Sequence, residues 1–323
     1  MSLETEALLD RRRLRRSMSF WRAAAVIAVV AALGVVGFMA AGETSGSLLG
    51  KQQIARVSLE GLITENRAQL RMLQKLARDD KVAAVILFVN SPGGTTTGGE
   101  ALFQAIRELA KKKPVVAQFG TIATSAAYIA GLASDHIIAR GNTITGSVGV
   151  IFQWAEVSEL LGKVGVKMNE IKSGPLKAEP SPFHPLEPAG RETAQKLVAE
   201  SMGWFRGLVA ERRKVDTAAI PGLEQGRIFS GREALTHKLI DAIGGEPEVV
   251  DYLVKDRGVV RGLKIVDWKP KNGDSFGFLG MATRGLAHML GLPEMAGGLF
   301  GDDSPFAALR MGGLVSVWQP GEK

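Results

Sequence analysis

The chain has 323 residues, 46% hydrophobic and 23% charged, which is enough to bury one large or two modest cores. It contains no cysteine, which excludes disulfides, thiolate zinc sites and cysteine nucleophiles. Its four histidines are scattered and form no HExxH pair, so neither a metal site nor a cofactor is expected. Six arginines fall within residues 1–22, directly before an apolar segment. The net charge of +7 is therefore not expected to mark a nucleic-acid partner.

The apolar segment that follows the arginines predicts a membrane anchor. Residues 23–41 are 19 consecutive residues without a charged or strongly polar side chain, and about 20 apolar residues span a bilayer. Basic residues stay on the cytoplasmic side. We therefore expect a cytoplasmic basic N-terminus (1–22), a single transmembrane helix (23–42) in contact with lipid of the bacterial inner membrane, and a periplasmic remainder. The alternative is a cleaved signal peptide, for which Ala40-Ala41-Gly42 is a weak cleavage site.

After a polar, glycine-containing linker at 43–52, strand-like and helix-like patterns alternate along a single soluble domain at 53–271. The patterns predict strands at 54–59, 82–89, 114–119, 135–140 and 263–268, and helices at 66–78, 99–112, 189–213, 232–237 and 246–255. On the long helix, the predicted apolar face comprises Leu197, Met202, Phe205 and Val209. Alternating strands and helices imply an α/β fold with parallel strands and right-handed crossovers. The glycine-rich, apolar tail at 272–323 is assigned no structure.

One serine, Ser125, lies where the strand at 114–119 gives way to small, helix-compatible residues. The amides of a first helical turn favour negative charge, so an exposed hydroxyl placed there suits a nucleophile in acyl transfer. The glycines Gly93 and Gly94 follow the neighbouring predicted strand, and chemistry in parallel sheets gathers beyond the carboxyl ends of the strands. The alternative is that Ser125 only caps its helix.

A serine hydroxyl is a weak nucleophile until a base accepts its proton. Histidine is the usual base, but His136 lies in a predicted buried strand, and His184, in a proline-rich loop, remains a rival. A neutral lysine is the other option. Lys177 has apolar neighbours and no acidic residue before Glu179.

Several short motifs follow one another in the order and spacing of the signal peptide peptidase A (SppA) family, which the chain resembles over about residues 54–250. They are Asn90-Ser91-Pro92-Gly93-Gly94, Thr124-Ser125-Ala126-Ala127-Tyr128, Thr145-Gly146-Ser147-Val148-Gly149-Val150, Lys172-Ser173-Gly174-Pro175-Leu176-Lys177 and a closing motif from Gly226 to Asp241. The anchor suits the short, single-repeat bacterial form. The resemblance implies a ClpP/crotonase-like fold of repeated βαβ units preceded by one N-terminal transmembrane helix.

The same resemblance implies a Ser–Lys dyad. Carried over by motif, Ser125 is the nucleophile, Lys177 the general base, and Ser147 the residue that orients the lysine amine. Lys172 is the competing lysine, and its motif position favours a structural or surface role.

An oxyanion hole is implied at the backbone amides of Gly93 or Gly94 and of Ala126. Glycine permits close approach of the backbone to a substrate carbonyl. The sequence departs from the family pattern in one respect, because the family often has glycines after the nucleophile where this chain has Ala126-Ala127. The added methyl groups are expected to narrow the neighbouring pocket.

The resemblance predicts a membrane-anchored serine endopeptidase that degrades residual signal peptides and similar extended apolar peptides as a ring-shaped homo-oligomer. Two alternatives remain open. A crotonase-type acyl-thioester enzyme would use the same oxyanion turn, but the anchor and the lack of an acidic pair near the glycines disfavour it. A non-catalytic, membrane-tethered scaffold would keep the fold without the chemistry.

Overall fold

The computed structural model describes residues 21, 25–26, 52–270 and 314–317, and the chain divides into two compact units, 1–51 and 52–323. In the first unit the described residues are Trp21, Ala25 and Val26, all helical. The N-terminus, the anchor and the linker predicted for 1–22, 23–42 and 43–52 therefore lie almost entirely outside the described residues. Within the part of the chain that is described, no helix has the length and apolarity needed to cross a membrane.

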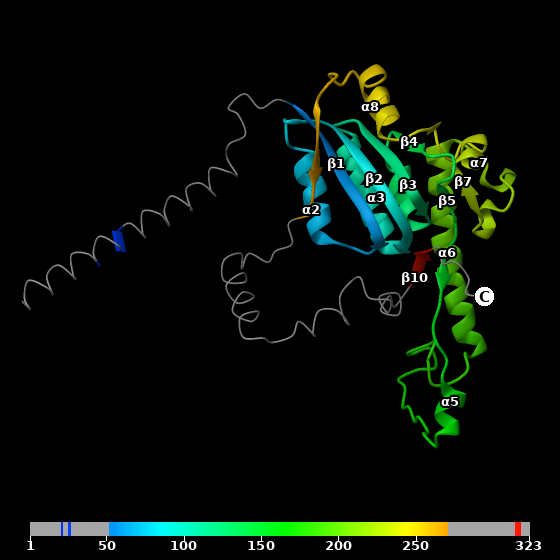
Figure 1. Ribbon diagram of the computed structural model, residues 1–323. Coiled ribbons are helices and arrows are strands. Elements are labelled where there is room, and N and C mark those ends of the chain that lie inside the picture. Colours follow the sequence, from blue (N-terminus) through cyan, green and yellow to red (C-terminus); the bar gives the residue numbers. More distant parts are fainter. Residues whose placement is uncertain (1–20, 22–24, 27–51, 271–313, 318–323) are drawn as a thin grey trace, which may run out of the picture. The chain divides into compact units, whose positions relative to one another are not determined.

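A mixed, mostly parallel sheet lies at the centre of the second unit (Figure 1). Its strand order is β6-β10-β2-β3-β4-β8, with β1 pairing β2 and β9, and β5 pairing β3 and β7. The pairs that involve β10, and the pair β5–β7, are antiparallel, and the other pairs are parallel. The strands are β1 (Gln53–Ile63), β2 (Val82–Thr95), β3 (Val115–Thr124), β4 (His136–Ala139), β5 (Ile144–Gly146), β6 (Ile151–Phe152), β7 (Ile228–Ser230), β8 (Ala242–Ile243), β9 (Lys264–Trp268) and β10 (Leu314–Val317).

Helices connect most of these strands, and local signals mark where several of them begin. Asn66 caps α2 by accepting hydrogen bonds from the N–H groups of Ala68 and Gln69. The helix α6 begins with Pro188, which needs no intrahelical partner at that position. The α-helices are α2 (Arg67–Leu76), α3 (Thr96–Ala110), α4 (Ala126–Leu132), α5 (Ser158–Lys163), α6 (Pro188–Arg213), α7 (Gly231–Thr236) and α8 (Glu246–Lys255).

The central strands are buried on both faces, which explains their continuous apolar runs. Along β2, Val85 and Leu87 belong to the larger hydrophobic cluster, which includes residues of α2, α3, α4 and α6. Ala84 and Ile86, at alternate positions, belong to a smaller cluster on the opposite face that includes residues of α8. The predicted α/β arrangement is confirmed, with mostly parallel strands and with antiparallel pairs at β10 and between β5 and β7.

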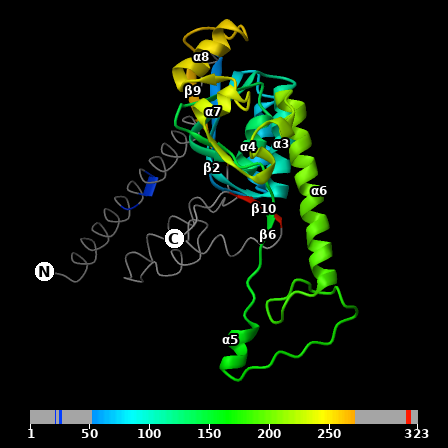
Figure 2. The same cartoon turned by 90° about the vertical axis from the view of Figure 1, so that its right-hand side faces the viewer.

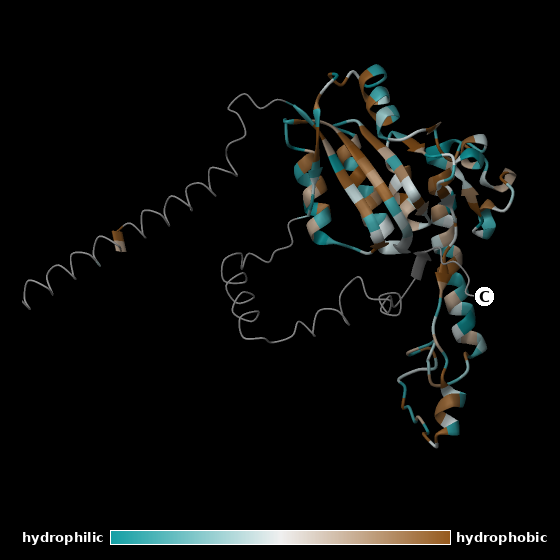
Figure 3. Cartoon of the chain, viewed as in Figure 1, coloured by the Kyte–Doolittle hydropathy of each residue, from teal (hydrophilic) through white to brown (hydrophobic). Residues whose placement is uncertain are grey.

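Residues 153–187, including α5, leave the sheet and extend away from it as a projecting segment, which we call the arm (Figures 1 and 2). Leu197, in the half of α6 nearest the arm, is 44% exposed, whereas Phe205 and Val209 in the other half are fully buried. The predicted burial of Leu197 was therefore wrong, because α6 packs on the body through its C-terminal half. The arm includes α5, which is hydrophobic in Figure 3. The large apolar side chains that the arm exposes are Trp154, Leu160, Val164, Val166, Met168, Ile171, Leu176 and Phe183.

Candidate active site

Ser125 lies at the junction of β3 and α4 with φ 59° and ψ −122°. Such angles are disfavoured for any residue with a Cβ, and they persist only where the surrounding structure fixes them. The side chain makes no capping hydrogen bond to α4, so the interpretation of Ser125 as a simple helix cap is wrong. Ser125 is also 1% exposed, rather than exposed as the sequence led us to expect, because it lies enclosed where the central strands end.

Ser147 follows β5 and lies beside the Ser125 junction. Thr124 is the register partner of Gly146, and the Ser125 N–H donates to the Gly146 carbonyl oxygen at 2.9 Å. Ser147 also has a positive φ, 52°, and its N–H donates to the Arg227 carbonyl at 2.9 Å. The structure thus places the two serines predicted to act together at adjacent strand ends.

The glycine motif reaches the same edge of the sheet because β2 continues through it, rather than ending before it as the sequence predicted. Ser91 of β2 is the register partner of Ala123 in β3. One step further along, the Thr124 hydroxyl donates to the Pro92 carbonyl oxygen at 3.0 Å. The segment that carries the predicted oxyanion amides is therefore joined directly to the residue that precedes Ser125.

Both glycines of this motif are required by the backbone. Gly93 has φ 113°, a conformation that other residues rarely adopt. A Cβ on Gly94 would lie 1.8 Å from the Ile63 carbonyl oxygen of β1. The Gly93 N–H donates to the Ser91 hydroxyl at 3.1 Å, and this bond holds the turn in place.

Three hydroxyl side chains that were not predicted as site residues support this end of the sheet. Ser91 accepts from Gly93, Thr124 donates to Pro92, and the Thr145 hydroxyl donates to the Ala123 carbonyl at 2.8 Å. The signal that could have identified them was a hydroxyl residue at the end of each of three neighbouring strands.

A cavity of about 450 Å³ opens beside Ser147, between the end of β5 and the 3₁₀ turn at Leu223–Gln225. It lies next to the predicted orienting serine and extends along β6 to α6. It is lined by Ser147, Gly149, Val150, Ile151, Val198, Met202, Glu224, Gln225 and Gly226.

Lys177 lies elsewhere, in an exposed turn of the arm, where its own N–H donates to the Gly174 carbonyl at 3.1 Å. The next residue, Ala178, has φ 63°, so a third strained backbone position lies beside a predicted site residue. The arm extends away from the body that contains α4 in both views (Figures 1 and 2). Within one chain, the structure brings together Gly93, Gly94, Ser125, Ala126 and Ser147 but not Lys177.

The rival bases in the arm are held in an ion cluster. The Lys172 amine lies 2.9 Å from Glu170 Oε2 and 3.0 Å from Glu179 Oε1, and His184 Nε2 lies 3.2 Å from Glu179 Oε1. Hydrogen bonds to Glu170 and then Glu179 raise the pKa of Lys172. A lysine whose ammonium form is stabilised in this way is a poor proton acceptor. Lys172 is therefore not available as a base, and His184 lies in the same ion cluster of the arm.

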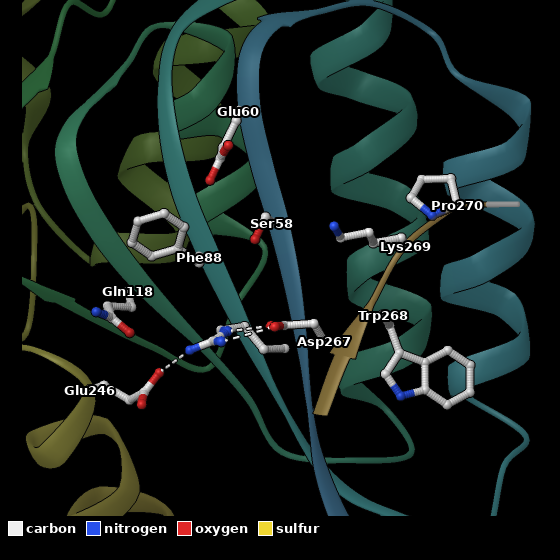
Figure 4. Close-up of a pocket in the computed structure, with 10 residues that line it drawn as sticks. Ser58, Glu60, Phe88, Gln118, Glu246, Asp267, Trp268, Lys269 and Pro270 are labelled. Carbon is white, nitrogen blue, oxygen red and sulfur yellow. Dashed lines mark hydrogen bonds and ion pairs between the residues drawn. The ribbon is translucent and has the colours of Figure 1, made fainter. Parts of the chain in front are cut away.

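A separate cavity of about 430 Å³ lies on the other face of the sheet (Figure 4). Across it, Arg56 donates to Asp267 Oδ1 at 2.6 Å and to Glu246 Oε2 at 2.6 Å. Neither Ser125 nor Ser147 lines this cavity, so it is distinct from the candidate site. Over the residues that the structure describes, no three His, Asp or Glu side chains are grouped to hold a metal ion.

Comparisons with known proteins show the family to which the chain belongs. The model of peptidase family S49 matches residues 107–260, and the Clp protease model matches residues 44–140. A protein named as a protease in Synechocystis sp. is 35% identical over 200 residues, which cover 61% of this chain and 72% of that protein. One named as a protease in Methanocaldococcus jannaschii is 32% identical over 246 residues, covering 67% and 79%. A protein named as a signal peptide peptidase SppA in Enterococcus faecium is 34% identical over 232 residues, covering 67% of each chain. The chain therefore belongs to peptidase family S49, the serine protease family whose motifs its sequence resembles.

Proposed function

We propose that this chain is a serine endopeptidase in which Ser125 is the nucleophile. The observation that carries the proposal is the Ser125 backbone, which is strained at a strand-to-helix junction where its side chain does not cap the helix. Strain of this kind is retained where it positions a functional group. The glycine motif and Ser147 lie at the same sheet edge, as acyl-transfer chemistry requires.

The chemistry combines these positions with a base, for which the sequence motifs indicate Lys177. The Ser125 hydroxyl oxygen attacks the carbonyl carbon of the peptide bond, and its proton passes to the amine of Lys177. The oxyanion accepts hydrogen bonds from the amides of Gly94 and Ala126, since the Gly93 N–H already donates to the Ser91 hydroxyl, and loss of one such donor typically costs about 10²–10³ in kcat. The carbon–nitrogen bond then breaks, the proton leaves with the amine, and water hydrolyses the acyl-serine ester.

The position of Lys177 favours a site completed by a second copy of the chain. Lys177 lies on the arm, and the arm exposes eight large apolar side chains. Exposed apolar surface of this extent is typical of a surface that is covered in an assembly. In the proposed ring-shaped homo-oligomer, the arm of one copy would lie against the body of the next, so that Lys177 meets Ser125 and Ser147 of the neighbouring copy.

The proposed substrates are extended, apolar peptides such as signal-peptide remnants. An extended peptide can add as a strand beside Gly93–Thr95 and gain main-chain hydrogen bonds there. With the anchor proposed at 23–42 inserted in lipid, the site would face the periplasm, close to peptides that leave the membrane. The two alanines after Ser125 would favour substrates with small side chains next to the cleaved bond.

The test is cleavage of an uncharged, extended peptide by the whole chain in detergent, with an acyl-thioester assayed in parallel. We expect the wild-type chain to cleave the peptide and the Ser125→Ala variant to lose this activity. The matched control is Ser58→Ala, which changes an exposed serine on the other face of the sheet and should cleave normally. Turnover of the thioester alone would favour a crotonase-type enzyme, and inactivity of the wild type on both would favour a scaffold.

A further inference from the structure

The described C-terminal strand, β10, lies between β2 and β6 and pairs antiparallel with both (Figures 1 and 2). On one edge Val315 lies opposite Thr95, Ser316 opposite Gly94 and Val317 opposite Gly93. On its other edge Leu314 lies opposite Phe152 and Val315 opposite Ile151. A segment from the far end of the chain therefore occupies the main-chain positions beside the glycine motif.

These positions are next to the nucleophile. The partner of Val317 is Gly93, which directly follows Pro92, and the Pro92 carbonyl accepts the hydrogen bond from Thr124. Thr124 is the residue before Ser125. The backbone of β10 is therefore level with Ser125 at Val317, where the cleaved bond of an extended substrate would lie.

An extended peptide and β10 cannot pair with the same backbone at the same time. Each residue of a strand has one N–H and one carbonyl for its ladder, and β10 already pairs with Gly93, Gly94 and Thr95. The sequence Leu314-Val315-Ser316-Val317 is uncharged and rich in β-branched residues, like the proposed substrates. It thus has the composition of a peptide that would bind at the strand position beside Gly93–Thr95, which we call the groove.

The pairing is also short enough to be displaced. The strand β10 has four residues, and its partner β6 has two. Elements held by few main-chain bonds open at a low free-energy cost.

We propose that β10 is an internal competitor of the substrate, which holds the groove beside Ser125 in the resting chain and leaves it when a peptide binds. This regulation rests on the proposed function, because it concerns the same groove. If β10 fills the groove nine-tenths of the time, the apparent affinity for peptide is reduced about tenfold.

The test compares two substitutions at Val315, the residue of β10 that is paired on both edges. Val315→Pro removes an N–H and disfavours the strand, whereas Val315→Thr keeps the β-branched shape and the amide. Both are made in the full-length chain with Ser125→Ala, so that binding of a fluorescent, uncharged, extended peptide is measured by anisotropy without cleavage. We expect binding about tenfold tighter in Val315→Pro and unchanged in Val315→Thr, and equal binding in the two would overturn the proposal.

A second measurement does not depend on any peptide. In Val315→Pro, hydrogen exchange at the amides of residues 93–95 should become faster than in Val315→Thr, because β10 no longer covers them. Unchanged exchange would show that β10 does not hold the groove and would also overturn the proposal. Failure of the proposed function would appear differently, as peptide cleavage that survives Ser125→Ala with the wild-type Val315.

Discussion

The backbone N–H of Ser125 donates to the carbonyl oxygen of Gly146 at 2.9 Å, and Gly146 directly precedes Ser147. This hydrogen bond joins the two serines through the backbone rather than through their side chains. Both serines have positive φ angles, 59° and 52°. Main-chain hydrogen bonds thus hold two strained residues next to each other and fix the backbone positions from which their side chains extend.

The strain at Ser125 predicts that glycine will stabilise this position. A backbone outlier of this kind costs about 1–3 kcal/mol, whereas glycine costs about 0.5–1 kcal/mol through the entropy of the unfolded chain. We expect the free energy of unfolding of Ser125→Gly, measured by urea denaturation, to be about 1 kcal/mol higher than that of Ser125→Ala. Both variants lack the hydroxyl and should be inactive. A Ser125→Gly variant less stable than Ser125→Ala would show that the junction is not strained.

The separation of Lys177 from Ser125 predicts that two variants, each inactive alone, will recover peptide cleavage when they are mixed. If the dyad forms between copies, a mixture of Ser125→Ala and Lys177→Ala chains contains sites that combine an intact serine with an intact lysine. In a ring mixed at equal ratio, about a quarter of the sites should be active, by random pairing of the copies. The measurement is peptide cleavage after dissociation and reassembly of the mixed chains.

Two controls accompany the mixing experiment. Each variant alone should stay inactive, and Lys167→Ala, which changes an exposed lysine of the same arm, should cleave normally. An active Lys177→Ala variant would remove Lys177 from the mechanism, and an inactive mixture of two inactive variants would show that the dyad does not form between copies.

The close approach of β1 to Gly94 predicts that one methyl group added at this position will strongly lower the stability of the fold. A Cβ at this position would lie 1.8 Å from the Ile63 carbonyl oxygen, a backbone atom that cannot move without disturbing the pairing of β1 with β2. We expect Gly94→Ala to lower the free energy of unfolding by about 2 kcal/mol or more. In Gly174→Ala, where nothing lies within 4 Å of the added atom, the effect should be small. Equal urea midpoints for the two variants would contradict this packing.

The surroundings of His136 predict that the stability of the protein depends on pH. Its ring stacks on Tyr252 with centroids 3.9 Å apart, and its Nδ1 lies 3.8 Å from Asp241 Oδ2. Burial lowers the pKa of His136 below its ordinary 6.5, and this effect outweighs the opposing influence of Asp241. Because the unfolded chain binds the proton more tightly, the contribution to stability is complete above about pH 6.5 and is lost as the pH falls towards the pKa of the folded state.

The variant His136→Phe keeps a ring for stacking and removes the titration. We expect its free energy of unfolding to fall less steeply than that of the wild type between about pH 7 and pH 5. The measurement is a series of urea denaturation curves across this range. Parallel pH profiles for the two proteins would show that His136 does not lose affinity for its proton on folding.

The order of elements around the site was predictable from the sequence because it depends on local patterns. The apolar runs of β2 and β3 and the small residues after Ser125 predicted the strands and α4, and parallel pairing followed from their alternation with helices. The motifs around Gly93, Ser125 and Ser147 predicted three positions that the structure places at one sheet edge. The resemblance to the signal peptide peptidase A family was predicted on the same motifs, and the match to peptidase family S49 confirms it.

Other features were decided only by the tertiary structure. The burial and positive φ of Ser125 are imposed by the strands that enclose it, and a serine before small residues reads locally as an ordinary cap. The exposure of Leu197 follows from where α6 leaves the body, which its apolar spacing does not encode. The pairing of Val317 with Gly93 joins positions far apart in the chain through a four-residue strand. Periodicity and capping act over a few neighbouring residues, so the sequence by itself determined the elements and the order of the motifs. Which distant backbone fills the edge beside Ser125 depends on contacts that form only when the sheet is assembled.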